Sequence, residues 1–312
     1  MKLLLSIIRK ALSFGFTGFI LLGTILQASA QQNSSAVIDP FESQYFINRY
    51  LANPSMAGLD SGLNLNAAYR QQYNGIPGAP VTQAFSADYN TGKRVGLGLI
   101  AYNDKAALIN NTRFALTYAY HLPIGTASQQ LHFGISGAFA HTQLDPKGIV
   151  GDQTDPAIAD FNGRKNQFEV DYGMGYTDTH ITLQASLSNL IGYMKHFNNT
   201  TADAATFYTA AAYKFIPDGD GPVNSIEPQV SFRGIKNYNS IVDVGANLVM
   251  FHHLLNIYGM YHTSGNFSAG VGVHYKDIVY IQGSYLSKTK GLRDYTDGNF
   301  EVDLTISLFR HR

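Results

Sequence analysis

The chain has 312 residues, and its 22 basic side chains balance its 22 acidic ones. This balance excludes a net electrostatic attraction for nucleic acid, so we expect no nucleic-acid partner. The absence of cysteine excludes a disulfide framework and the lipidated cysteine of a bacterial lipoprotein. Charged residues make up only 14%, while 20 tyrosines and 19 phenylalanines give a heavy aromatic load without any tryptophan.

The first 30 residues have the pattern of a secretory signal peptide. A basic start is followed by an apolar run at 11–26 and by the sequence ASA at 28–30. Signal peptidases cleave after such a small-x-small sequence. We therefore predict that residues 1–30 are a signal peptide and that the mature, exported chain begins at Gln31. An uncleaved membrane anchor is the alternative.

Residues 31–60 come before the first predicted strand and have no strand pattern of their own. The segment carries Phe41, Tyr45, Phe46 and Tyr50, and a free tail would leave these rings in water. We predict that it packs in the interior or on the periplasmic rim of the domain that follows, as a plug. A tethered periplasmic tail is the alternative.

From residue 61 onwards, apolar residues alternate with small or polar ones. In FEVDYGMGY (168–176) the large apolar side chains have one parity, whereas Glu169, Asp171 and two glycines have the other. A period of two is a β-strand signal, and no helical periodicity competes with it. The predicted strands are 61–70, 81–89, 94–103, 112–121, 131–141, 168–176, 180–190, 206–215, 226–234, 240–250, 254–263, 266–275, 277–286 and 299–309.

These segments have the length that a tilted strand needs to cross a bilayer, roughly nine to eleven residues. We predict an all-β fold, a transmembrane antiparallel outer-membrane β-barrel of about 14 strands that occupies residues 61–312. Its apolar face would contact outer-membrane lipid. A soluble β-sandwich or solenoid, whose strands are shorter, is the alternative. The tyrosines predicted to form the interfacial girdle are Tyr69, Tyr89, Tyr102, Tyr120, Tyr176, Tyr213 and Tyr275.

Connection lengths give an independent indication of orientation. The connections between consecutive predicted strands can be numbered from the first. The long ones, at 142–166, 191–205 and 287–297, all have odd numbers. In outer-membrane barrels the outer loops are long and the periplasmic turns are short. We therefore predict that the odd-numbered connections are the outer loops.

The sequence predicts no catalytic, cofactor-binding or metal-binding residues. The histidines fall mostly at strand ends or on the inward face, and no G-x-S-x-G element accompanies them. The turn DGDGPVNSIE (218–227) lacks the ligand spacing of a calcium loop, and His252-His253 is too short a cluster for a metal site. We expect no enzyme activity.

Some charged residues are predicted to face the interior. Glu169, Asp171, Glu301 and Asp303 occupy the inward parity of two separate strands. Arg113 and Arg233 are their possible counterparts. These charges could line an open path or form a packed network.

The stretch from Phe41 to about residue 124 carries a series of motifs: QY (44–45), NPSMAG (53–58), YRQQY (69–73), GAPVTQ (78–83), NDK (103–105) and YAY (118–120). Through these motifs it resembles the PorP/SprF family of type IX secretion system membrane proteins. Tyr73 stands where many members have tryptophan, and Phe309 is not the terminal residue that barrel-assembly machinery often reads.

The resemblance implies a role in protein secretion, with components of the type IX translocon or motor, or a secreted cargo such as a surface adhesin, as partners. It also implies a place in gliding motility. A diffusion channel or porin for small solutes is the alternative, for which an open interior with asymmetric rings of charge is typical. The residues that we predict to contact a partner are Gln44, Tyr45, Asn53, Pro54, Tyr69, Arg70, Tyr73, Gly78 and Pro80.

Overall fold

The computed structural model describes the greater part of the chain beyond the predicted signal peptide. The signal peptide, Phe41 and most of the predicted long outer loops lie outside the described residues. All described residues belong to one compact unit, Ile38–Arg312. The described ranges are 44–73, 78–125, 128–145, 167–194, 206–219, 221–235, 240–276, 278–287 and 298–309.

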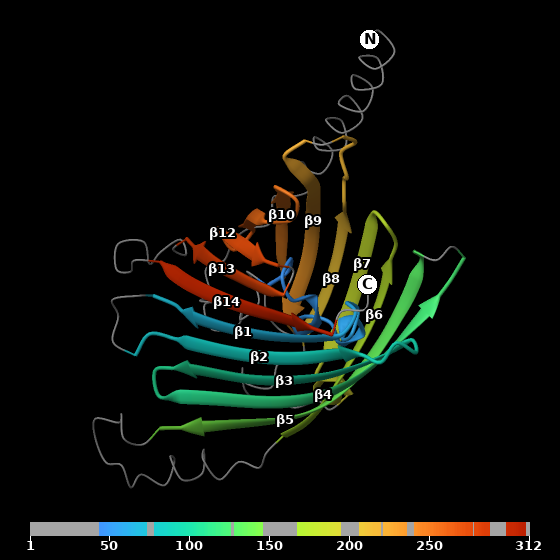
Figure 1. The fold of residues 1–312 in the computed structure, drawn as a ribbon. Helices are drawn as coiled ribbons and strands as arrows, with labels where there is room; N and C mark the ends of the chain where they lie inside the picture. The colour runs from blue at the N-terminus through green and yellow to red at the C-terminus, as the bar shows by residue number, and fades with distance from the viewer. Residues whose placement is uncertain are drawn as a thin grey trace, which may run out of the picture. The chain divides into compact units, whose positions relative to one another are not determined.

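Fourteen antiparallel strands pair in chain order, and the last strand pairs with the first to close a barrel (Figure 1). This confirms the predicted fold class. The strands are β1 (Leu63–Gln71), β2 (Val81–Asn90), β3 (Val95–Ala106), β4 (Ile109–Pro123), β5 (Gln130–Leu144), β6 (Gln167–Thr177), β7 (Ile181–Ser188), β8 (Thr206–Tyr213), β9 (Val223–Ile235), β10 (Ile241–Met250), β11 (Leu255–His262), β12 (Asn266–Tyr275), β13 (Val279–Leu286) and β14 (Asn299–Leu308).

The seam of the barrel lies between β1 and β14. Every residue of β1 has a partner on β14, from Leu63 opposite Leu308 to Gln71 opposite Phe300. Closure pairs the backbone groups of both strands, as a hydrocarbon layer requires.

The barrel has two ends, which differ in the connections that they hold. The hairpin end holds the connection between β2 and β3 and every second one after it, and the loop end holds the connection between β1 and β2 and every second one after it.

Side chains alternate between the two faces of the wall as predicted. On β12, Phe267, Val271 and Val273 are exposed on the outer face, whereas Ser268 and Gly270 are buried on the inner face. Large apolar side chains on the outer face and small or polar ones inside are typical of a membrane barrel.

Tyr102 is an exception to the predicted tyrosine girdle. On β3 the exposed apolar residues are Leu97 and Leu99, so Tyr102 has the opposite parity and faces the interior. There it packs against a buried cluster that includes Tyr50. The prediction that it joins the girdle is therefore wrong, because its parity was overlooked. Of the other girdle tyrosines, Tyr69, Tyr89, Tyr120, Tyr213 and Tyr275 are exposed on the outer face.

β4 and β5 are longer than predicted, with 15 residues each. Apolar alternation ends near Phe114, but the strands continue with polar side chains. The Asn103 amide donates hydrogen bonds to Asn110 Oδ1 at 2.8 Å and to Thr112 Oγ1 at 2.9 Å. Strands β3 to β5 therefore extend at the loop end beyond the apolar band.

Three short helices also occur in the described residues: η1 (Arg49–Leu51), η2 (Pro54–Met56) and α3 (Leu190–Met194). Within the described ranges no helix has the length and hydropathy to cross a membrane.

Candidate functional site: the barrel interior

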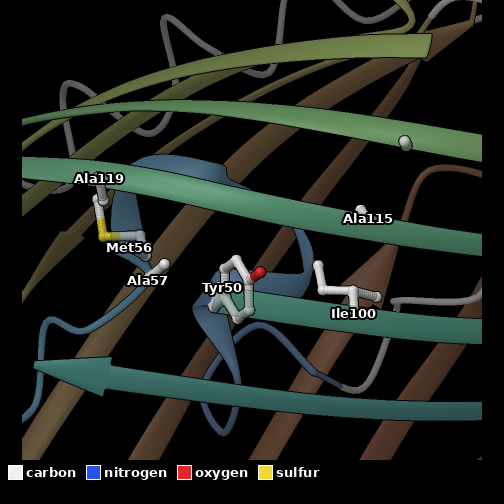
Figure 2. Close-up of a cluster of buried hydrophobic side chains, with 7 residues drawn as sticks. Tyr50, Met56, Ala57, Ile100, Ala115 and Ala119 are labelled. Atoms are coloured by element: carbon white, nitrogen blue, oxygen red, sulfur yellow. The ribbon is translucent and has the colours of Figure 1, made fainter. Parts of the chain in front are cut away.

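Residues 44–58, called the interior segment below, contact the inward side chains of the wall. The Tyr50 hydroxyl donates to Thr117 Oγ1 at 2.7 Å, and burial raises the pKa of Tyr50, so the hydroxyl stays protonated. Figure 2 shows Tyr50 near Ile100 and Met56 near Ala119, on the inner side of the wall. The cluster consists of Tyr50, Met56, Ala57, Ile100, Ala115, Ala119 and Ala138.

The second half of the interior segment is built around Asn53. Its Oδ1 accepts hydrogen bonds from the backbone nitrogen of Ser55 at 3.0 Å and from Ser55 Oγ at 2.8 Å, and so caps η2. Pro54 fits the first helical position, where no backbone donor is needed. The Asn53 amide also donates to the backbone oxygen of Met174 on β6 at 3.1 Å. The cap thus fixes the helix and ties it to the wall.

Glycines on the wall make room for this half. A Cβ atom at Gly96 would collide with the Ala57 carbonyl, and one at Gly134 would collide with the backbone between Pro54 and Ser55. At Gly173 the obstacle would be the Asn53 side chain. The inward glycines of β3, β5 and β6 therefore allow direct contact between the two backbones.

The first half of the interior segment contacts carboxylates instead. The Gln44 amide nitrogen donates to Glu301 and Asp303 on β14. The Tyr45 hydroxyl donates to Asp243 Oδ2 at 3.3 Å. The most buried ring contact of this half is the stacking of Tyr45 on Tyr208, with 5.4 Å between the ring centroids.

Arg49 completes the contacts of this half by an ion pair with Glu227 on β9. Its guanidinium is the one positive charge that the side chains of Gln44, Tyr45 and Arg49 bring to the wall. The first half therefore meets the wall mainly through neutral donors to charged acceptors.

The inward charges form paired contacts. Arg113 binds Glu169 at 2.7 Å and Asp171 at 2.5 Å, so the predicted counterpart is confirmed for these two acids. The prediction of Arg233 as a counterpart of the four acids is wrong, because it binds Asp243 on the adjacent strand at 2.8 Å.

The counterpart of Glu301 is Arg70, which the sequence did not indicate. It is 2% exposed and forms an ion pair with Glu301 across the seam. The described charges thus form a packed network, one of the two arrangements that the sequence left open.

Two histidine contacts escaped sequence reasoning. The Nδ1 atoms of His121 and His132 are 2.8 Å apart, and His121 Nε2 lies 3.1 Å from the Ala57 carbonyl. The two histidines are directly opposite each other on β4 and β5. They join the hairpin end of the wall to the interior segment.

The second contact joins Ser268, His262 and Asp243 in the order of a Ser-His-Asp catalytic triad. His262 Nδ1 lies 2.7 Å from Asp243 Oδ1, and its Nε2 lies 3.0 Å from Ser268 Oγ. However, Ser268 is 1% exposed and the Asp243 carboxylate also binds Arg233. A catalytic serine needs room for an acyl group beside its Oγ, and burial leaves none here. Strand register could have suggested the pairing of Asp243 with His262, because they are opposite each other on β10 and β11.

The structure divides the predicted partner residues into two groups. Gln44, Tyr45, Asn53, Pro54 and Arg70 are buried in the interior, where their described contacts are with the chain itself. Partner contact stays a prediction for all nine residues.

Tyr69 and three residues of the loop end form the other group. Tyr69 is exposed on the outer face of β1. The Tyr73 nitrogen donates to Asn299 Oδ1 at 2.9 Å. The Gly78 and Pro80 carbonyls accept from the nitrogens of Ala107 and Gln72 at 3.0 and 2.9 Å. These contacts fix the base of the first loop, of which residues 74–77 lie outside the described residues.

The interior segment and the barrel both fall within one sequence family. The family model of the type IX secretion system membrane protein PorP/SprF matches residues 34–306. The chain belongs to the PorP/SprF family. Together with the closed barrel and its apolar outer face, this membership makes it an integral outer-membrane protein. No curated protein matches the chain.

Solved structures resemble this PorP/SprF protein only at the level of the barrel. A mutant porin of Rh. blastica has a TM-score of 0.36 at 9% identity, covering 79% of this chain and 99% of the porin. A mutant of the TodX monoaromatic hydrocarbon channel has 0.41 at 8%, covering 82% and 91%. A bacterial polysaccharide outer membrane secretin has 0.43 at 7%, covering 80% and 99%. Such distant likenesses say nothing of what this chain binds.

Proposed function

We propose that this barrel holds a partner protein for the type IX secretion system at the outer membrane. The partner is a component of the translocation machinery or motor, or a secreted or surface-anchored cargo such as an adhesin. Family membership supports the secretion system. The observation that carries the choice of a protein partner is the occupied interior, with residues 44–58 packed against the wall.

An occupied interior argues against the solute-channel alternative. A porin needs a continuous polar path lined by asymmetric charge. Here Tyr50, Met56 and Ala57 are buried against the wall. The charge of Arg113 is paired with two carboxylates and does not line an open path. The interior segment therefore acts as a plug in this proposal.

The loop end is the favoured place for partner contact. Strands β3 to β5 continue there with polar side chains, such as Asn103 and Thr112, past the apolar band. Tyr73, Gly78 and Pro80 lie at the same end. Polar strands that leave the lipid give a partner a rigid surface. The proposal includes no catalytic step, in keeping with the burial of Ser268.

The deciding experiment is crosslinking and affinity capture of the tagged protein from native outer membranes, followed by mass spectrometry. We expect type IX translocon components or one large secreted protein to be recovered. A double variant, Y73A/P80A, should recover less of it, whereas T209A on the outer face of β8 is the matched control and should change nothing. Capture of the barrel alone would contradict the proposal.

Conductance tests the plug separately. Deletion of residues 31–58 should raise ion conductance in planar bilayers, because it removes the interior segment. Unchanged conductance of a folded deletion variant would show that the segment does not block the lumen.

A further inference from the structure

The last peptide bond of the interior segment, between Ala57 and Gly58, is held by side chains of the wall. The Ala57 carbonyl oxygen lies 3.1 Å from His121 Nε2 on β4. The Gly58 nitrogen donates to Asp88 Oδ2 at 3.0 Å, and the Gly58 carbonyl accepts from Asn90 Nδ2 at 2.7 Å, both on β2. We call this set the clamp, and it consists of Asp88, Asn90, His121 and the neighbour of His121 on β5, His132.

The two histidines form a directed chain of hydrogen bonds behind the Ala57 carbonyl. A carbonyl oxygen only accepts, so His121 Nε2 carries a hydrogen. In the neutral ring His121 Nδ1 is then an acceptor, and His132 Nδ1 donates to it across 2.8 Å. His132 Nε2 in turn accepts from the Thr177 hydroxyl at 2.8 Å. With both rings neutral, each of the four ring nitrogens has a suitable partner.

A proton added to this pair has no counterion at the ring nitrogens. His121 is 4% exposed and His132 is 0% exposed, and their ring nitrogens contact each other, backbone oxygen of the interior segment and the Thr177 hydroxyl. One added proton makes a buried cation, which is costly without an ionised partner. A second would place two N–H groups face to face across the same 2.8 Å. The clamped state therefore favours two neutral rings.

The charged groups around the pair form their hydrogen bonds elsewhere. Asp88 accepts from the Gly58 nitrogen, and Asp178, which follows Thr177, accepts from two backbone nitrogens of its own turn. The Arg94 side chain is exposed, and its backbone oxygen accepts from the His121 nitrogen at 2.7 Å. The protonation that matters to the clamp is therefore that of the two histidines.

The chain on either side of the clamped peptide permits a local movement. Gly58 and Gly62 have φ values of 69° and 84°, a region that glycine adopts without strain. On the other side the Asn53 cap ties η2 to the backbone of Met174 on β6. Release of Ala57 and Gly58 thus requires no displacement of η2 and no opening of the barrel.

We propose that the clamp is a proton-sensitive switch, which holds the end of the interior segment while both histidines are neutral and releases it when the pair binds a proton. Once the Ala57–Gly58 peptide has left, water can reach His121 and solvate the cation, so the released state binds the proton at lower cost.

The direction of the pH dependence follows from this difference. A histidine in water has a pKa of about 6.5, so the clamp is complete above about pH 6.5 and weakens as the pH falls below it. Uptake of one proton changes the ratio of released to held segment by up to about tenfold for each pH unit.

The test uses the full-length protein in lipid vesicles with one nitroxide spin label on a D60C variant, because the chain has no cysteine of its own. Asp60 is exposed and closely follows the clamped peptide. Electron paramagnetic resonance should show an immobile label at about pH 8 and a reversible mobile fraction that grows below about pH 6.5. H252N, in an exposed turn at the hairpin end, is the matched control and should keep this response.

Two variants connect the response to the histidine pair. H121Q/H132N replaces both rings with amides, which can donate to the same acceptors but do not titrate, so the label should stay immobile at both pH values. H121A removes the donor to Ala57 and should give a mobile label at both. Retention of the folded form in gels run without boiling shows that each variant is a closed barrel before the label is measured.

NMR of the protein with isotope-labelled histidine measures the proton positions directly. At about pH 8 His121 should be the Nε2–H tautomer and His132 the Nδ1–H tautomer, with H121A used to assign the signals. If the amide variant is mobile at both pH values, these tautomers decide the question.

Three results would overturn the inference: a label that is equally immobile at both pH values, a pH response that persists in H121Q/H132N, or a cationic or reversed tautomer pair at about pH 8. The second result would assign the response to another group. The inference does not rest on the proposed function, because these measurements contain no partner and no conductance. Capture of type IX components can therefore succeed or fail independently of it.

Discussion

The two halves of the interior segment are held by different kinds of contact. Asn53 to Gly58 lie against strands β2 to β6, where backbone meets backbone over glycines and a cap fixes η2. The side chains of Gln44, Tyr45 and Arg49 meet carboxylates on β9, β10 and β14. The second half is therefore held mainly by close backbone packing and the first half mainly by contacts with charged groups.

The largest expected effect comes from removing the guanidinium of Arg70, which pairs with a carboxylate that the first half contacts. R70A leaves Glu301 and Asp303 buried without their guanidinium, and loss of one partner of a buried ion pair costs about 3–5 kcal/mol. Unfolding by urea in lipid vesicles, followed by far-UV circular dichroism because the chain has no tryptophan, measures the loss. R70A/E301Q should recover part of it. A loss below about 0.5 kcal/mol would show that the ion pair is not buried.

The close packing of the second half against the wall can be disrupted at Gly134. G134V places a side chain where the backbone of Pro54 and Ser55 now lies, and overpacking of this kind costs about 1–3 kcal/mol. The variant should also raise conductance, because η2 is pushed from the wall. G259V is the matched control, since a Cβ atom at Gly259 meets nothing within 4 Å. Equal stability of the two variants would argue against direct backbone contact.

A smaller effect is expected at the cap of η2. N53A removes the acceptor for Ser55 and the donor to Met174, and loss of an N-cap costs about 1 kcal/mol. N53S keeps a capping oxygen and should lose less. The same urea unfolding measures both, and an N53S protein as unstable as N53A would show that the bond to Met174 dominates.

The smallest effect is expected outside both halves. Lys105 and Asp145 form an ion pair at 3.8 Å, with side chains 54% and 37% exposed. Such surface pairs contribute about 0–1 kcal/mol, so K105A should leave unfolding nearly unchanged. A loss as large as that of R70A would mean that the exposed pair is as important as the buried one.

The fold could be predicted from the sequence because alternation is a local signal. The alternation from Phe168 to Tyr176 indicates both a strand and its two faces, and it does so without information from any other strand. The contacts of the interior depend on register between distant strands, and for this reason they escaped prediction. Arg70 meets Glu301 because the first strand pairs with the last.

The candidate site was predictable in part. The aromatic residues of 31–60 indicated packing, since Tyr45 and Tyr50 would be unfavourable in water. The wall that receives them was not predictable, because Gly134 and Gly173 read as ordinary strand glycines. Only the structure places a cap and a helix turn over them. The Asp243 and His262 pair was hidden for the same reason, as it requires the alignment of β10 with β11.

The seam between β1 and β14 encloses the interior segment. The chain enters β1 directly from the interior segment through Gly58 and Gly62, so the segment and the first half of the seam are covalently continuous. β14 is the last strand of the barrel in chain order, and the ring is open until it pairs with β1. The backbone of the interior segment lies against β3, β5 and β6, so the pairing that closes the ring also encloses the segment.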